Sequence, residues 1–159
     1  FGAGPHLLRG IEMYKGKPIC YSLGNFFFQY ETVKQIPAEV YEANNLEITT
    51  LDPSLSYDKF RFPQDPVYWE SVVPLITYQD GRVVELKLYP VVLGQKAPRF
   101  ERGTPVLAAP EEGQQIMMRL AKLCEPYGTA LRVEPDGVGV IRVAEPSQQP
   151  VAGVLRNEE

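Results

Sequence analysis

The sequence predicts an α+β fold that is rich in β-hairpins. Three pairs of short apolar or alternating runs are each joined by a turn signal, which is the pattern of a hairpin. These turn signals are KGK at residues 15–17, Asp80-Gly81 and Asp136-Gly137. Residues 110–125 instead repeat their apolar side chains with a helical period. The 13 glycines and 15 prolines favour many turns and short elements over long helices.

The first hairpin is expected from strands at residues 11–14 and 18–23, with Gly16 in the turn. Three phenylalanines follow at residues 26–28, and such a run fits neither the period of a strand nor that of a helix. We expect all three rings to fill a gap in the core between layers.

Residues 31–70 predict a long, irregular excursion on the surface. A short helix is expected within residues 37–45, because Pro37 suits a first helical turn. Trp69 is expected to anchor the end of this excursion in the core.

The second hairpin has the clearest strand pattern in the chain. Residues 84–88 alternate between apolar and charged side chains, as a half-solvated strand requires. Residues 72–78 would form the partner strand across the Asp80-Gly81 turn. Pro74 within it predicts either a bulge or an edge position.

The helix expected at residues 110–125 begins with Pro110, followed by two glutamates that suit its N-terminus. Its predicted apolar stripe consists of Ile116, Met117, Leu120, Leu123 and Cys124. This stripe must be buried on a sheet. After the last hairpin, residues 145–159 lack periodicity, so we expect one domain over residues 1–144 and a flexible tail.

Composition argues against several classes of protein. The net charge is −4 and no basic stripe is visible, which disfavours nucleic-acid binding. No apolar run reaches the roughly 18 residues that a membrane-spanning helix needs. Cys20 and Cys124 are too few for a disulfide scaffold or a structural zinc site, so two buried free thiols are expected.

His6 is the only histidine, and it follows the small-residue loop Gly2-Ala3-Gly4-Pro5. Such a loop lets the backbone approach a ligand or ion closely. Imidazole is the commonest side-chain metal ligand, yet one histidine does not make a metal site. The residues alone therefore leave two readings open, a hydrogen-bonded loop histidine and a metal ligand.

The segment GPHLLRGIEMYKGKPICYSLGNFFFQYETV resembles the signature of the CapA family, which it matches from Gly4 to Phe28. That signature runs Gly-His-x-Pro-His, a Gly-Ile-Glu strand, a Tyr-x-Gly-Lys-Pro turn and Tyr-Ser-Leu-Gly-Asn-Phe. The later segments YWESVV, LYPVVLG and RGTPVLA also resemble one CapA-like subgroup, up to about residue 143. The family comprises bacterial proteins of capsule and poly-γ-glutamate synthesis related to calcineurin-like metallophosphatases.

The resemblance implies the C-terminal half of a metallophosphatase-like two-sheet αββα sandwich. The start at Phe1 would then be a cut within a longer protein, and the N-terminal half of the domain would be a missing partner. The parent could be a hydrolase or transferase that holds Mn, Fe or Zn, with an anionic polymer or a phosphorylated substrate as its partner. The resemblance leaves localisation open between the cell envelope and the cytoplasm of a bacterium.

The resemblance places His6 at the family's second loop histidine, a metal ligand, whereas Ala3 falls at the first. A methyl group cannot coordinate a metal, so this chain alone is not expected to be catalytic. Ala3 also favours an alternative, a non-catalytic binding or scaffold member of the same fold. A small α+β module with an unrelated role is a third possibility.

Glu12 and Asn25 are the two candidate catalytic residues. Glu12 is either an exposed strand acid that pairs with Lys15 or Lys17, or a cleft-facing partner of the histidine. Asn25 either holds a tight loop through backbone hydrogen bonds, or points its amide at the substrate or a metal-bound water.

Overall fold

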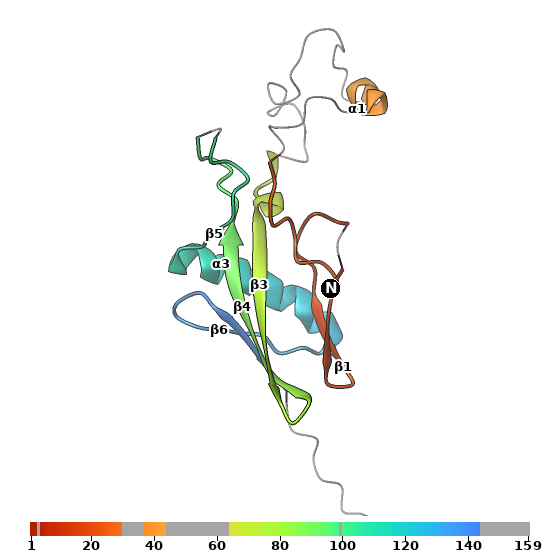
Figure 1. Cartoon of the computed structure of the whole chain (residues 1–159), viewed down its shortest axis with the longest axis vertical. Helices are drawn as coiled ribbons and strands as arrows, with labels where there is room; N and C mark the ends of the chain where they lie inside the picture. The colour runs from red at the N-terminus through yellow and green to blue at the C-terminus, as the bar shows by residue number, and fades with distance from the viewer. Residues whose placement is uncertain (3, 30–36, 44–63, 99, 144–159) are drawn as a thin grey trace, which may run out of the picture.

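The computed structural model describes residues 1–2, 4–29, 37–43, 64–98 and 100–143, and it confirms an α+β fold (Figure 1). A five-stranded antiparallel sheet has the order β3-β4-β7-β6, with β5 paired to β4, and β1 and β2 form a separate hairpin. The long helix α3 crosses one face of the larger sheet (Figure 1).

The strands are β1 (Ile11–Tyr14), β2 (Lys17–Cys20), β3 (Glu70–Gln79), β4 (Arg82–Val92), β5 (Val106–Leu107), β6 (Arg132–Val133) and β7 (Gly139–Arg142). The helices are α1 (Ala38–Ala43), η3 (Pro66–Trp69), α3 (Pro110–Cys124) and η4 (Glu125–Tyr127).

The β1–β2 hairpin is confirmed, with a two-residue turn at Lys15 and Gly16, both at positive φ. Its second strand ends at Cys20, three residues earlier than expected. Just after β2, two isolated bridges join Leu23 to Leu8 and Gly24 to Ser71. These bridges carry the chain from the hairpin to the start of β3.

The β3–β4 hairpin is also confirmed, and Asp80 and Gly81 both have the positive φ of its tight turn. Pro74 pairs with Leu88 without a break in register, and the bulge falls instead between Thr77 and Tyr78. Because β3 is the terminal strand of the sheet, the edge position that Pro74 predicted is confirmed.

Helix α3 begins at Pro110 as expected and buries one side against the sheet. The buried positions are Gly113, Ile116, Met117, Leu120 and Cys124. Leu123 does not belong to this set, because it lies at the margin of the stripe and remains 38% exposed. The prediction was therefore wrong for Leu123. The backbone of Gly10 packs closely on Leu123, because a Cβ added at Gly10 would lie 2.2 Å from the Leu123 carbonyl oxygen.

The main core lies between α3, the larger sheet and the β1–β2 hairpin. It contains Leu8, Ile11, Cys20, Val72, Val83, Leu86, Leu88, Ile116, Met117, Leu120, Cys124 and Ile141. Both cysteines are buried and unpaired, as predicted. Burial is the main cause that raises the pKa of the Cys20 and Cys124 thiols above their ordinary value.

A smaller core cluster closes the end of the sheet where β3 begins. It contains Phe28, Trp69, Val91 and Leu93, with the ring of Phe28 edge-on to Trp69 at 4.9 Å. Trp69 is thus the anchor that the sequence predicted. Phe26 and Phe27 are 47% and 64% exposed, which corrects the prediction that all three rings are core. A bend at Phe26 turns the chain so that only Phe28 reaches the cluster.

Helix α1 confirms a short helix within the excursion, although residues 30–36 and 44–63 lie outside the described part. The tail expected at residues 145–159 also lies outside it. The last hairpin is confirmed, and Gly137 at its turn has φ 84. That glycine also lets the turn approach α3, because a Cβ there would lie 2.8 Å from the carbonyl oxygen of Pro110.

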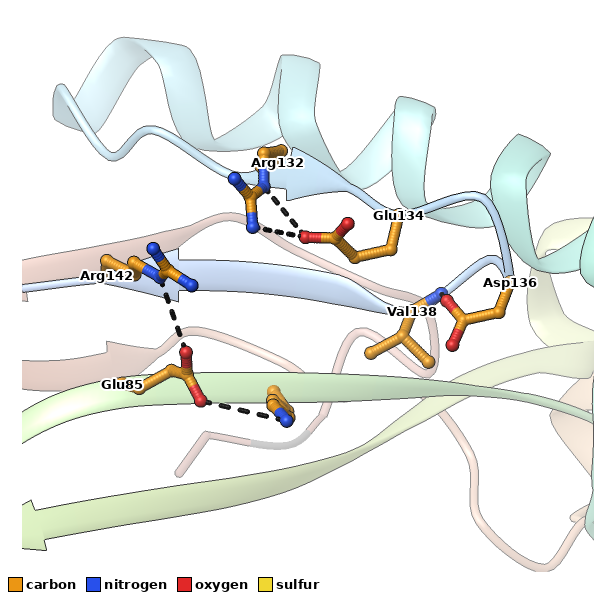
Figure 2. A network of polar contacts seen from close by, with 7 residues as sticks. Glu85, Arg132, Glu134, Asp136, Val138 and Arg142 are labelled. Carbon is orange, nitrogen blue, oxygen red and sulfur yellow. Dashed lines mark hydrogen bonds and ion pairs between the residues drawn. The ribbon is translucent and has the colours of Figure 1, made fainter.

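The face of the sheet opposite α3 is charged across β4, β7 and β6 (Figure 2). The carboxylate of Glu85 lies 3.5 Å from Arg142 Nε and 4.0 Å from Lys87 Nζ. Arg132 on β6 forms an ion pair with Glu134, the residue that directly follows this strand. Sheet-on-sheet packing buries apolar inner faces. This charged part of the sheet face is therefore unsuited to the interior between two packed sheets. The two-sheet αββα sandwich stays a prediction.

Candidate functional site

Three segments meet where β3 begins, and Asn25 lies between them. The residue is 9% exposed, and its Nδ2 donates to the carbonyl oxygens of His6 (3.0 Å) and Tyr68 (2.9 Å). Next to it, Ser71 Oγ donates to the carbonyl of Leu23 at 2.7 Å. These bonds fix the histidine loop and η3 against the Gly24-Asn25 turn.

The amide of Asn25 determines which ring nitrogen of His6 carries a proton. Two carbonyl oxygens require donors, so Nδ2 must face them and Oδ1 must face His6. Asn25 Oδ1 lies 2.7 Å from His6 Nδ1, and an amide oxygen can only accept a hydrogen bond. His6 Nδ1 is therefore the donor, and a neutral imidazole in this position carries its lone pair at Nε2.

The backbone of the histidine loop is held in an uncommon conformation. His6 has φ 60, in the left-handed region, and Gly4 nearby has φ 118. Such a φ is rare for a residue with a side chain and persists where surrounding bonds determine it. The bond from Asn25 Nδ2 to the His6 carbonyl supplies that support, and the His6 residue itself is exposed.

Glu12 lies on β1 and has a partner that neither reading of the sequence included. Its Oε2 accepts a hydrogen bond from the Tyr21 hydroxyl at 2.5 Å. This bond is the main cause that raises the pKa of Tyr21 above its ordinary value. Glu12 pairs with Ile19, so Tyr21, two residues further along, is the diagonal neighbour of Glu12. The contact could therefore have been predicted from the correct register of the hairpin. A catalytic role for Glu12 stays a prediction.

The structure brings together two of the three candidate residues, His6 and Asn25. The loop-holding bonds of Asn25 agree with one of its two readings, and its bond to His6 was not predicted. Within the described ranges, no group of three or more His, Cys, Asp and Glu side chains could hold a metal ion. His6 fits as one ligand with its ring oriented by Asn25, so further ligands would have to come from outside these ranges.

Comparison with known proteins matches the first part of the chain to one family. Residues 1–30 match the family described as bacterial capsule synthesis protein PGA_cap. The match includes the histidine loop, the β1–β2 hairpin and the Gly24-Asn25 turn. It supports the resemblance to capsule synthesis proteins over this segment, and the assignment of later residues to the C-terminal part of that family stays a prediction.

Two curated proteins of Sinorhizobium fredii (strain NBRC 101917 / NGR234) are similar to most of the chain. They are the uncharacterized proteins y4sH and y4uA, each 38% identical over 154 residues, which is 89% of this chain and 33% of the relative. The chain thus spans about a third of the length of these relatives. Among the described residues, no helix is long and apolar enough to cross a membrane.

Proposed function

We propose that the chain is part of a longer capsule synthesis protein in which His6 is one ligand of a divalent metal ion. The observation that carries the proposal is the hydrogen bond between Asn25 Oδ1 and His6 Nδ1. Histidines that bind metals commonly donate their second ring N–H to an oxygen, which orients the ring and fixes its tautomer. Asn25 supplies that oxygen, and the amide is itself fixed by two carbonyls.

The remaining ligands would come from the part of the longer protein that this chain does not include, since the curated relatives are about three times as long. Mn, Fe or Zn held there would polarise a phosphoryl, ester or amide group and activate water. In this chain, His6 would bind the ion, and Asn25 would hold the imidazole in position. An anionic polymer or a phosphorylated compound is the proposed substrate class.

A second proposal is a non-catalytic binding or scaffold protein. It is favoured by Ala3, which takes the position of a family histidine and cannot coordinate a metal. In that case the bonds between His6 and Asn25 would serve only to close the loop.

Metal analysis of the longer protein separates the two proposals. The wild type, His6→Ala and the control Arg9→Ala would be purified without added chelator, and bound Mn, Fe and Zn would be measured by mass spectrometry. Arg9 is an exposed residue of the same loop. We expect metal in the wild type and in Arg9→Ala, and a clear loss in His6→Ala. A wild-type protein without metal would favour the scaffold, whereas an unchanged metal content in His6→Ala would remove His6 from the metal site.

A further inference from the structure

We propose that Ser71 on β3 is a positioning residue for His6 and acts through the turn at Gly24 and Asn25. This inference rests on the proposed role of His6 as a metal ligand and adds a residue that orients the ligand. Ser71 lies outside residues 1–30, the segment that matches the family of capsule synthesis proteins. The histidine site therefore extends to a strand that this match does not include.

The hydroxyl of Ser71 is directed at the turn from inside the protein. The residue is 1% exposed, and its Oγ donates to the carbonyl oxygen of Leu23 at 2.7 Å. An antiparallel bridge also pairs Ser71 with Gly24. The side chain and the backbone of one buried residue thus hold two consecutive residues of the turn. Because Ser71 is buried, water has little access to replace its hydroxyl in this bond.

The turn lies directly on the backbone at the start of β3. Gly24 has φ 80, and a Cβ added there would lie 2.5 Å from the carbonyl oxygen of Glu70. On its other side, the Gly24 N–H donates to Ser22 Oγ at 3.3 Å, and Ser22 is also 1% exposed. These contacts define the position from which the side chain of Asn25 starts.

The segment that supplies these contacts is anchored in the smaller core cluster. Tyr68 accepts a hydrogen bond from the Asn25 amide with its carbonyl oxygen, and Ser71 donates to the turn. Trp69 lies between them in the chain, is 3% exposed, and packs edge-on to Phe28. Ser71 therefore acts from a rigid strand, which suits a residue that determines the orientation of another.

Asn25 transmits the position of the turn to the imidazole. Its amide makes hydrogen bonds of 2.7–3.0 Å to His6 Nδ1 and to the carbonyl oxygens of His6 and Tyr68. Such bonds weaken steeply when their geometry departs from the optimum. A displaced turn would therefore weaken the bond to Nδ1 and lower the preference for a proton on that nitrogen. In the preferred tautomer the lone pair is on Nε2, where a metal ion would bind.

The tautomer of His6 is the readout that tests Ser71, because a purely structural role would lower stability without changing it. Long-range ¹H–¹⁵N spectra of the 159-residue wild type, Ser71→Ala and Asn25→Ala would be recorded at a pH where the ring is neutral. We expect Ser71→Ala to lower the ratio of Nδ1–H to Nε2–H by about threefold or more, in the direction of Asn25→Ala, since one ordinary hydrogen bond corresponds to a factor of that size. An unchanged ratio in Ser71→Ala would overturn the proposal.

Two further variants make this result decisive. Thr129→Val is the matched control, because it also removes a buried hydroxyl that is hydrogen-bonded to the backbone, at Met13. It should change the ratio by less than about twofold, because it shares no partner with Ser71 or His6 in these bonds. Equal changes in Thr129→Val and Ser71→Ala would indicate general loosening and would contradict the proposal. If Ser71→Ala does not fold, Ser71→Cys carries the test, because it has nearly the same size and only a weak S–H donor. An unchanged ratio in Ser71→Cys would then count against the proposal in the same way.

Failure of this proposal can be distinguished from failure of the metal proposal. Loss of metal from the longer protein in His6→Ala, together with an unchanged tautomer ratio in Ser71→Ala, would leave the metal site intact and remove Ser71 from it. A lowered ratio in Ser71→Ala, together with a longer wild-type protein that binds no metal, would keep Ser71 as a positioning residue and contradict only the metal.

Discussion

Ile11 donates its backbone N–H to Cys124 Sγ at 3.3 Å, and two residues later Met13 donates to Thr129 Oγ1 at 3.2 Å. In the register of the hairpin these two N–H groups point away from β2. Side chains from the end of α3 and the segment after it therefore provide the acceptors that a further strand would otherwise supply. This arrangement attaches the β1–β2 hairpin to the helix.

Thr129 provides a test of that attachment, because the residue is only 6% exposed. Thr129→Val keeps the shape and removes the acceptor, so it should lower the free energy of unfolding by about 1–3 kcal/mol. Thr129→Ser keeps the hydroxyl and should cost less. Urea denaturation measures both. A loss in Thr129→Ser that exceeds the loss in Thr129→Val would mean that the methyl group, and not the hydrogen bond, stabilises this contact.

The buried thiols should be unreactive in the folded chain. Burial raises the pKa of both Cys20 and Cys124, and only the thiolate reacts. With a dithionitrobenzoate reagent at pH 8, we expect no rapid reaction of the native protein and two reacting thiols in denaturant. Since the folded pKa of each thiol is raised, its stabilising contribution is present below the ordinary thiol pKa and is lost as pH rises through the folded value. A rapid native reaction would indicate frequent opening of the core.

The tautomer of His6 is a direct test of the candidate site. Since this is the only histidine, long-range ¹H–¹⁵N spectra of the imidazole show a single set of signals. At a pH where the ring is neutral, we expect the proton on Nδ1, because Asn25 Oδ1 accepts from it. Asn25→Ala should abolish this preference. If the wild type carries its proton on Nε2, the proposed orientation of the ring for a metal ion is wrong.

The hairpins and the helix could be predicted because their signals are local. Asp80-Gly81 and Asp136-Gly137 define turns by backbone conformation, and the period of α3 defines its buried side. The errors concern side chains whose burial depends on distant elements. Leu123 belongs to the apolar pattern but lies at its margin, and Phe27 follows a bend that the pattern does not reveal.

The candidate site was only partly accessible to sequence reasoning for the same reason. His6 could be selected as the only histidine in a small-residue loop. Its contact with Asn25 joins residues 19 positions apart, and the contact of Arg119 with Glu70 joins residues 49 apart. Neither spacing has a local signature, so the orientation of the imidazole and the ion pair of Glu70 required the tertiary structure.

Phe27 and Phe28 should differ sharply in their effect on stability. Phe28 is buried against Trp69, so Phe28→Ala should cost about 3–5 kcal/mol of the free energy of unfolding. Phe27 is 64% exposed, and Phe27→Ala should cost less than about 0.5 kcal/mol. Urea denaturation of the two variants measures the difference. A large loss in Phe27→Ala would show that this ring is covered in solution, for example by a second copy, which sedimentation would detect.

Glu70 predicts how stability changes with pH. Its folded pKa is raised by burial in spite of Arg119, so its contribution to stability is fully present below the ordinary carboxyl pKa and is lost as pH rises through the folded value. Glu70→Gln resembles the protonated form at every pH. The free energy of unfolding of the wild type should therefore fall relative to Glu70→Gln as pH increases from acid to neutral, measured by urea denaturation in a pH series.

Arg119 supplies the second arm of that experiment. Its hydrogen bond and charge lower the pKa of Glu70, so Arg119→Gln should leave burial unopposed and make the loss of stability with rising pH steeper. The slope of the free energy of unfolding against pH should be steeper in Arg119→Gln than in the wild type. This comparison of slopes tests the opposing effects of burial and Arg119 on Glu70 separately from the overall stability of each variant. If the wild type instead gains stability relative to Glu70→Gln as pH rises, the ion pair with Arg119 outweighs the effect of burial on Glu70.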